Sequence, residues 1–105
     1  MYNQFINIKD GVKFKRLTTP ILKLINTIIS VWSYHDLSSP TITSANDSKH
    51  MKSSLHYKDM AIDIRTKDLS KEQISNVFKS LEDTLGESFQ CVLESDHIHL
   101  EFDNK

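Results

Sequence analysis

Residues 89–102 read FQCVLESDHIHLEF, two apolar-rich runs separated by Ser95 and Asp96. A two-residue gap between alternating runs is typical of a β-hairpin, and it fixes which residues face each other across the two strands. The predicted cross-strand pairs are Phe89 with Phe102, Cys91 with Leu100, Val92 with His99, Leu93 with Ile98 and Glu94 with His97. One face of this hairpin is then apolar, and the other carries Glu94, His97, His99 and Glu101.

Two helices are expected upstream of the hairpin. Apolar residues recur at helical spacing from Thr19 to about Tyr34, and Thr19 can cap this helix. A second helix is expected from about Lys71 to Leu85, because Ser70 and Gln73 have the spacing of a capping box at its start. Both apolar stripes are typical of helices that pack on a core.

Two further strand candidates lie between the predicted helices. Thr41–Ser44 is short, whereas 60–65 alternates, so that Ile62 and Ile64 face one way and Ala61, Asp63 and Arg65 the other. Strands and helices in this order predict an α+β domain, a small antiparallel sheet with two main helices packed on it. At 105 residues the chain is expected to form a single domain, 1–105.

Composition excludes some classes of partner. Lys and Arg total 13 against 14 Asp and Glu, so neither nucleic acid nor an anionic membrane is expected to bind. The longest apolar-rich stretch, 20–32, is too short to span a bilayer. Residues 1–11 lack the apolar core of a secretory signal, so the protein is expected to be made in the cytoplasm. It is also expected to be a monomer. The single cysteine, Cys91, is expected to be a buried apolar residue of the hairpin.

Four of the five histidines fall in two groups, His50 with His56 and His97 with His99, and carboxylates lie near each group. A catalytic zinc needs three nitrogen or oxygen ligands and one open position. We expect His56, Asp63 and His99 to be these ligands, provided that the last hairpin pairs near the strand of Asp63. The alternative is that His97 and His99 are solvated or hydrogen-bonded residues of a polar strand face.

Two sequence motifs extend this prediction. Residues 54–63, SLHYKDMAID, resemble the motif Ser-x-His-x-x-Gly-x-Ala-x-Asp of the D-alanyl-D-alanine carboxypeptidase and L-alanyl-D-glutamate endopeptidase family. Residues 96–101, DHIHLE, resemble its Asp/Glu-x-x-His element, in the same order along the chain. The resemblance covers about 41–102 and is greatest to short, phage-borne members. The hedgehog signalling domain is a relative with the same metal cage. One position departs, because Asp59 stands where the motif has glycine.

The resemblance implies a hedgehog-like or DD-peptidase-like fold, zinc held by His56, Asp63 and His99, Ser54 near the substrate, and a carboxylate near His99 as the base. Family spacing favours Asp96 as this base, whereas the predicted hairpin pairing favours Glu94, and both remain candidates. His97 can stabilise an oxyanion. Two residues are candidates for substrate binding: Arg65 for a carboxylate, and His50 for the pocket wall, although each can equally be an exposed residue without a role.

The expected function is that of a zinc metallopeptidase that cleaves peptidoglycan stem peptides, as a carboxypeptidase or an endopeptidase. It would act at the cell wall in phage lysis or bacterial wall processing. In such an enzyme zinc polarises the peptide carbonyl and the carboxylate base takes a proton from the attacking water. The alternative is a weakly active or inactive zinc-stabilised binding domain, since hedgehog relatives carry the cage without peptidase activity.

Overall fold

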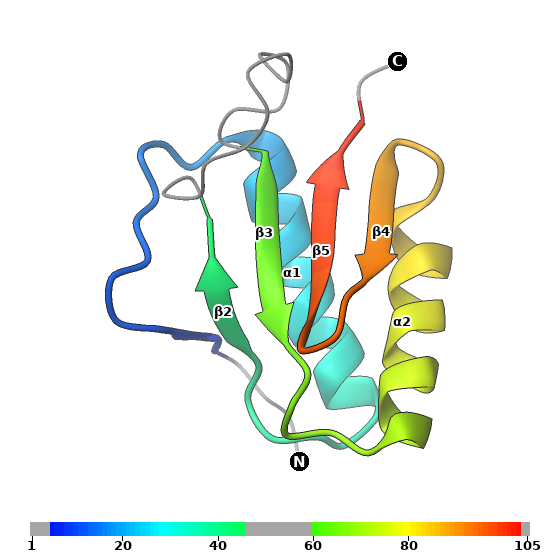
Figure 1. Cartoon of the computed structure of the whole chain (residues 1–105). Helices are drawn as coiled ribbons and strands as arrows, with labels where there is room; N and C mark the ends of the chain where they lie inside the picture. Colours follow the sequence, from blue (N-terminus) through cyan, green and yellow to red (C-terminus); the bar gives the residue numbers. More distant parts are fainter. Residues whose placement is uncertain (1–4, 46–59, 104–105) are drawn as a thin grey trace.

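The computed structural model of the chain describes residues 5–45 and 60–103. Within these ranges a five-stranded sheet packs against two helices, the α+β fold that the sequence predicts (Figure 1). The helices are α1 (Thr19–Tyr34) and α2 (Lys71–Leu85); the strands are β1 (Asn7–Ile8), β2 (Thr41–Ser44), β3 (Ala61–Arg65), β4 (Phe89–Leu93) and β5 (His97–Phe102). Neither helix is long and apolar enough to cross a membrane.

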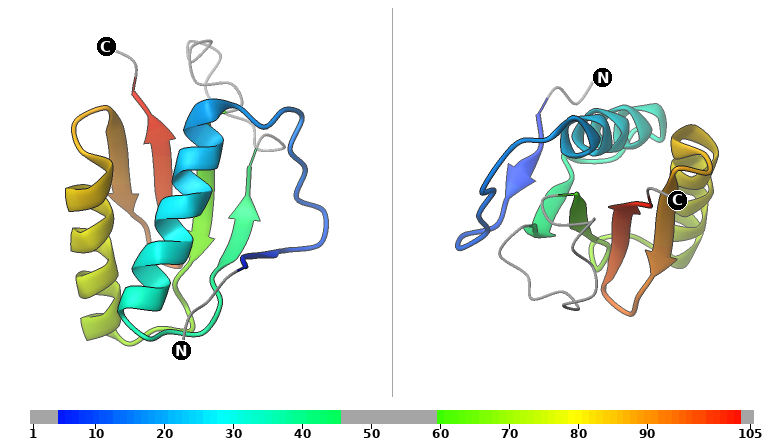
Figure 2. Two further views of the ribbon diagram at one scale, coloured as in Figure 1. Left: turned by 180° about the vertical axis from the view of Figure 1, so that it is seen from behind. Right: turned by 90° about the horizontal axis from the view of Figure 1, so that it is seen from above.

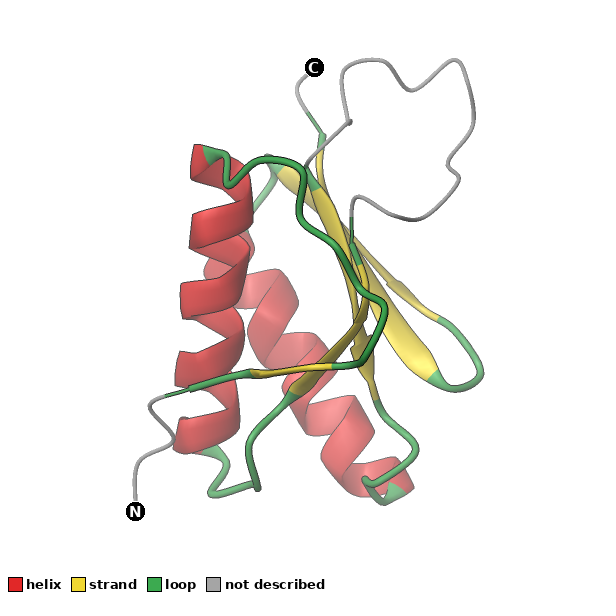
Figure 3. Ribbon diagram, turned by 90° about the vertical axis from the view of Figure 1, so that its left-hand side faces the viewer, coloured by secondary structure: helices red, strands yellow, loops and turns green. Residues whose placement is uncertain are grey.

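The two helices lie on the same side of the sheet. Viewed along its edge, the molecule has one layer of helix and one of strand, and no described helix covers the opposite side of the sheet (Figure 3). The view from above shows the same division (Figure 2). Strand alternation explains it: Ile62, Ile64, Ile98 and Leu100 are at most 1% exposed and pack with the buried side chains of the helices. The alternate, polar residues of β3 and β5 therefore lie on the open face.

The strand order is β1-β2-β3-β5-β4, and it corrects the expectation of a purely antiparallel sheet. β1 pairs with β2 in parallel, through backbone hydrogen bonds from Asn7 to the carbonyl of Pro40 at 2.8 Å and from Lys9 to that of Ile42 at 3.0 Å. The other neighbouring strands pair antiparallel, as expected. β1 escapes prediction because it has two residues, both exposed, and so no alternation of buried and exposed positions.

The predicted hairpin is confirmed in its register. Phe89 pairs with Phe102, and the next pairs along β4 and β5 also follow the expected register. The backbone N–H of Glu94 donates to the carbonyl of His97 at 2.9 Å, which closes the turn. Cys91 packs against the core, and burial raises the pKa of its thiol to about 11. The thiol is therefore protonated at neutral pH, but Cys91 is half-buried rather than buried as expected.

Both helices begin at side-chain caps. Ser70 and Gln73 form the expected capping box, with hydrogen bonds of 2.9 and 3.1 Å. The cap of α1 is Thr18 rather than the expected Thr19: the Thr18 hydroxyl accepts from the N–H of Ile21 at 3.3 Å. The Thr18 carbonyl also accepts the first helical hydrogen bond, from Leu22 at 3.0 Å. Thr19 is thus already the first helical residue.

Candidate functional site

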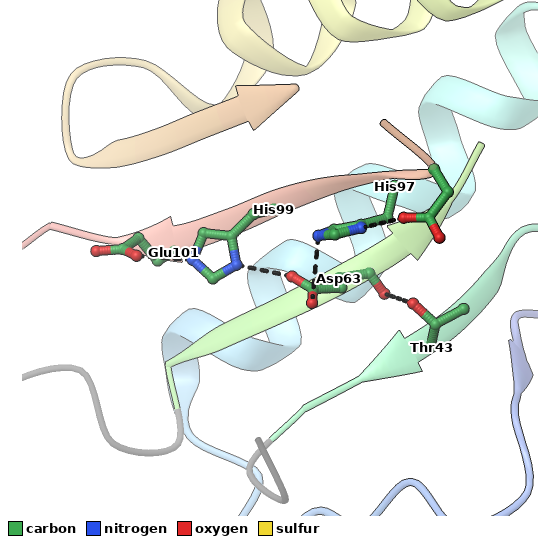
Figure 4. Close-up of polar contacts among 6 residues, drawn as sticks. Thr43, Asp63, His97, His99 and Glu101 are labelled. Carbon is green, nitrogen blue, oxygen red and sulfur yellow. Dashed lines mark hydrogen bonds and ion pairs between the residues drawn. The ribbon is translucent and has the colours of Figure 1, made fainter. Parts of the chain in front are cut away.

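The register of β3 and β5 builds the candidate site on the open face of the sheet. Asp63 lies directly opposite His99, Arg65 opposite His97 and Ala61 opposite Glu101. This confirms the prediction that the last hairpin pairs beside the strand of Asp63. Side chains of directly opposed residues share one face and lie within reach of each other. Polar side chains from three separate segments of the chain meet here: Thr43 of β2, Asp63 of β3, and His97, His99 and Glu101 of β5 (Figure 4).

His99 is held between two carboxylates. Its Nδ1 lies 2.7 Å from Oδ1 of Asp63, and its Nε2 lies 2.7 Å from Oε1 of Glu101. The hydrogen bond to Asp63 is the largest cause that raises the pKa of His99, to about 9, and Glu101 adds to it. At neutral pH both ring nitrogens therefore carry protons and donate to the two carboxylates. The side chains of His99 and Asp63 are each 18% exposed, so this is a largely buried charged cluster.

His97 forms a second carboxylate contact on the same face. Its Nδ1 lies 2.7 Å from Oδ1 of Asp96, and its Nε2 lies 3.6 Å from Oδ2 of Asp63. The hydrogen bond from His97 is the largest cause that lowers the pKa of Asp96 below its ordinary value. The Asp96 carbonyl accepts from the N–H of Thr66 at 3.1 Å, which fixes the hairpin turn against the end of β3. Asp63 thus faces one imidazole with each of its carboxylate oxygens.

The two candidates for the base differ in position. Asp96 is exposed, contacts His97 and lines a cavity of about 330 Å³ beside Asp63. Glu94 is exposed at the end of β4 and does not line this cavity; its described contact is the backbone hydrogen bond that closes the turn. Strand alternation favoured Glu94 as the base. It correctly predicts the sheet face that His97 and His99 share, but it does not predict that Asp96 contacts His97.

A β-bulge shapes the other side of the site. Ile42 pairs with Ile64, whereas Ser44 pairs with Asp63, so β2 holds one extra residue, Thr43, between them. The Thr43 hydroxyl donates to the carbonyl of Asp63 at 3.5 Å. The bulge brings the hydroxyl side chains of Thr43 and Ser44 to the cavity, which is lined by Lys9, Thr43, Ser44, Asp63, Arg65, Lys67, Asp96 and His97.

Several of these lining residues were not predicted from the sequence. Lys9 and Lys67 lie in segments with no motif, and Thr43 and Ser44 were expected in a short strand within the family resemblance, without a role in the site. The signal for Lys67 was its position two residues beyond Arg65 at the end of a strand that bears site residues. Lys9 has no comparable local signal, because its place at the cavity depends on the parallel pairing of β1 with β2.

Some predicted site residues lie outside the described ranges. These are His50, Ser54 and His56, together with Asp59, which replaces the motif glycine. Their assignments remain predictions from the sequence. Within residues 5–45 and 60–103, no group of three His, Cys, Asp or Glu side chains is arranged to hold a metal ion.

The donor atoms of Asp63 and His99 are of the types that bind zinc, and the distance between them is close to that in a zinc site. Ligand atoms about 2.0–2.2 Å from a tetrahedral zinc lie about 3.3–3.6 Å apart, so Oδ1 of Asp63 and Nδ1 of His99, now 2.7 Å apart, must separate by about 0.6–0.9 Å. The Nε2 hydrogen bond to Glu101 can remain when Nδ1 binds a metal. A carboxylate on the far nitrogen is the usual support of a zinc-binding histidine.

Comparisons with protein-family models, with curated proteins and with solved structures gave no match for this chain. The resemblance to the carboxypeptidase family therefore depends on the motifs in residues 54–63 and 96–101.

Proposed function

We propose that this chain is a zinc-dependent peptidase that cleaves peptidoglycan stem peptides, with the metal held by His56, Asp63 and His99. The observation that carries the proposal is the cross-strand pair of Asp63 and His99, whose donor atoms lie 2.7 Å apart on the open face of the sheet. No described helix covers this face of the sheet (Figure 3). Bound zinc would polarise the scissile carbonyl and acidify water.

The chain's own residues would do the remaining work. Asp96 is the proposed base: it is exposed at the cavity and ionised, and its hydrogen bond from His97 fixes the direction of the carboxylate. It would take the proton from the attacking water and pass it to the leaving amine. His97 would use Nε2, which faces Asp63 and the cavity, to stabilise the oxyanion. Glu101 would orient His99.

A second candidate function follows from the same contacts. Both ring nitrogens of His99 already have carboxylate partners at 2.7 Å, so the cluster is satisfied as an ion-paired network without a metal. A binding domain without turnover would use such a network for stability and its open face for a ligand. The arrangement needs no base, so Asp96 would then be only a residue of the turn.

Metal content and turnover separate these functions. The peptidase should purify with one zinc per chain and release new amines from peptidoglycan, and mass spectrometry of digested muropeptides should identify the bond. His56→Ala, Asp63→Ala and His99→Ala should each lose tight zinc and activity, because two ligands leave an incomplete cage. His35→Gln is the matched control, since His35 bonds Ser80 of α2, far along the chain from the cluster. Full zinc in Asp63→Ala would refute the ligand assignment; an absence of cleavage, with or without bound zinc, would favour the binding domain.

A further inference from the structure

The cavity beside Asp63 extends away from the proposed zinc ligands toward the β1 edge of the sheet. From β1 across to β5, its lining includes Lys9, Thr43, Arg65 and His97, each from a different segment of the chain. Lys67 adds a further cation from the turn after β3. The volume of about 330 Å³ is sufficient for one amino-acid residue of a substrate, and it lies at the low end of small-molecule sites.

The carboxylates and the cations that line this cavity differ in their contacts. Its two carboxylates are engaged with imidazoles: Oδ1 of Asp96 lies 2.7 Å from His97, and Oδ1 of Asp63 lies 2.7 Å from His99. In the part of the chain that the structure describes, no carboxylate lies within ion-pair distance of the three cations, Lys9, Arg65 and Lys67. The cavity thus presents cationic and hydroxyl donors whose natural complement is an anion.

We propose that this cavity binds a carboxylate of the peptide substrate, with Arg65 as the main anchor and Lys9 and Lys67 as the residues that select an anionic substrate. The carboxylate can be the C-terminal group of a peptide or an acidic side chain. The identity of the ligand as a peptide rests on the proposed function, whereas the preference for an anion rests on the cavity lining alone. The Ser44 hydroxyl supplies a further donor at the same wall.

Three small probes test the proposal and separate the two sources of carboxylate. N-acetyl-D-alanine carries only a C-terminal carboxylate, N-acetyl-D-isoglutamine carries only a side-chain carboxylate, and N-acetyl-D-alanine amide is neutral. Each keeps one acetyl amide bond in the place of the scissile bond, so release of acetate is monitored in the same samples while the purified full chain is titrated by amide chemical shifts. One or both acids should bind at least about tenfold more tightly than the neutral amide, as expected for charge-assisted hydrogen bonds.

Variants then assign the binding to the cavity. Arg65→Gln should weaken binding of the acid about 10-fold to 100-fold, and Lys9→Met and Lys67→Met about 2-fold to 5-fold each. Arg65→Lys, which keeps the charge but loses the planar fork, should fall between wild type and Arg65→Gln. Lys71→Met is the control, because Lys71 is an exposed residue at the start of α2, in the helical layer. The neutral amide should bind all variants equally.

The outcomes separate this inference from the proposed peptidase. Tighter binding of either acid, lost in the cavity variants, supports the anion site even if the protein shows no zinc and no cleavage. Equal affinity for acid and amide, or cavity variants that behave like Lys71→Met, would overturn the anion site even if the protein is an active peptidase.

Discussion

Asp63 is the residue on which the chemistry of the open face depends. It contacts His99 through one carboxylate oxygen, at 2.7 Å, and approaches His97 with the other, at 3.6 Å. A carboxylate placed between two imidazoles can hold a proton, an imidazolium or a metal ion, depending on which is present. The contacts of Asp96 and His97 therefore bear on the choice of base, and the contacts of His99 determine how the metal-free protein responds to pH.

The first prediction concerns the base. Asp96→Asn keeps the shape of the side chain but removes its proton-accepting ability, so turnover of a muropeptide should fall about 100-fold to 10,000-fold with zinc still bound. Glu94→Gln is the matched control and should cost at most about tenfold, because Glu94 does not line the cavity. If both amides cleave at nearly the normal rate, the carboxylate-base mechanism is wrong and His97 becomes the residue to test.

The second prediction concerns pH. In the metal-free protein the pKa of His99 is raised from 6.5 to about 9, so the folded state holds this proton more tightly than the unfolded state. The resulting stabilisation is fully present below pH 6.5 and is lost as the pH rises through about 9. Urea unfolding in the presence of a chelator should therefore show a decreasing free energy of unfolding across this window. His99→Gln should lack this decrease; an equal decrease in that variant would assign the effect to another group.

For single residues, the sequence predicted the sheet face of a side chain better than its contacts. Alternation placed Asp63 and His99 on polar strand faces, and the described register confirms that they meet. It could not show that Asp96 pairs with His97, because Asp96 lies in the turn, where strand alternation no longer sets the direction of a side chain. The cationic side of the cavity also depends on Lys9, which reaches it through pairing between segments more than 30 residues apart.

The helices and the hairpin are the elements whose boundaries follow from local sequence. Ser70, Gln73 and Gly86 mark both ends of α2, and the gap of Ser95 and Asp96 sets the register of β4 with β5. These signals act over a few residues, so they could be read from the chain without knowledge of its neighbours. β1 has no such signal, since two exposed residues give no pattern and only its pairing with β2 defines it.

The third prediction tests the start of α2. Ser70→Ala removes the side-chain acceptor for the N–H of Gln73, 3.1 Å away, and with it half of the capping box. The free energy of unfolding should fall by about 1 kcal/mol, measured by urea denaturation. Ser75→Ala, an exposed position inside the same helix, is the control and should leave stability unchanged or slightly increased, because alanine is the better interior helix former. Equal losses in both variants would contradict the capping role.

The molecule as a whole is a sheet covered on one side, with the proposed metal ligands on the other. β3 lies between β2 and β5 in the strand order, so Asp63 stands in the interior of the sheet rather than at an edge. A metal that joins His99 on β5 to Asp63 on β3, and to His56 before it, would connect segments that are distant in the sequence. Its binding would then favour the folded state over the unfolded chain.

The fourth prediction follows from this connection. Zinc at a free concentration of about 100 times its dissociation constant stabilises the folded state by about 2.7 kcal/mol, which in a chain of this size raises the melting temperature by about 10–20 °C. Adding a chelator should reverse the increase. The Asp63→Asn variant should melt at one temperature with or without zinc. A melting temperature of the wild type that does not respond to verified removal of zinc would count against a metal that bridges these strands.

The strand order also has a consequence for the time at which the site forms. β5 is the last described strand to be synthesised, yet it inserts between β3 and β4, both of which precede it in the chain. Until β5 is in place β4 has no neighbour in the sheet and β3 has only β2, and the long-range pairing of β3 with β5 is a slow event in folding. We therefore expect Asp63 to acquire its histidines at a late stage of folding. A partly folded chain would have its helices but not the donor pair of Asp63 and His99. This face could therefore bind a metal only after the sheet is complete.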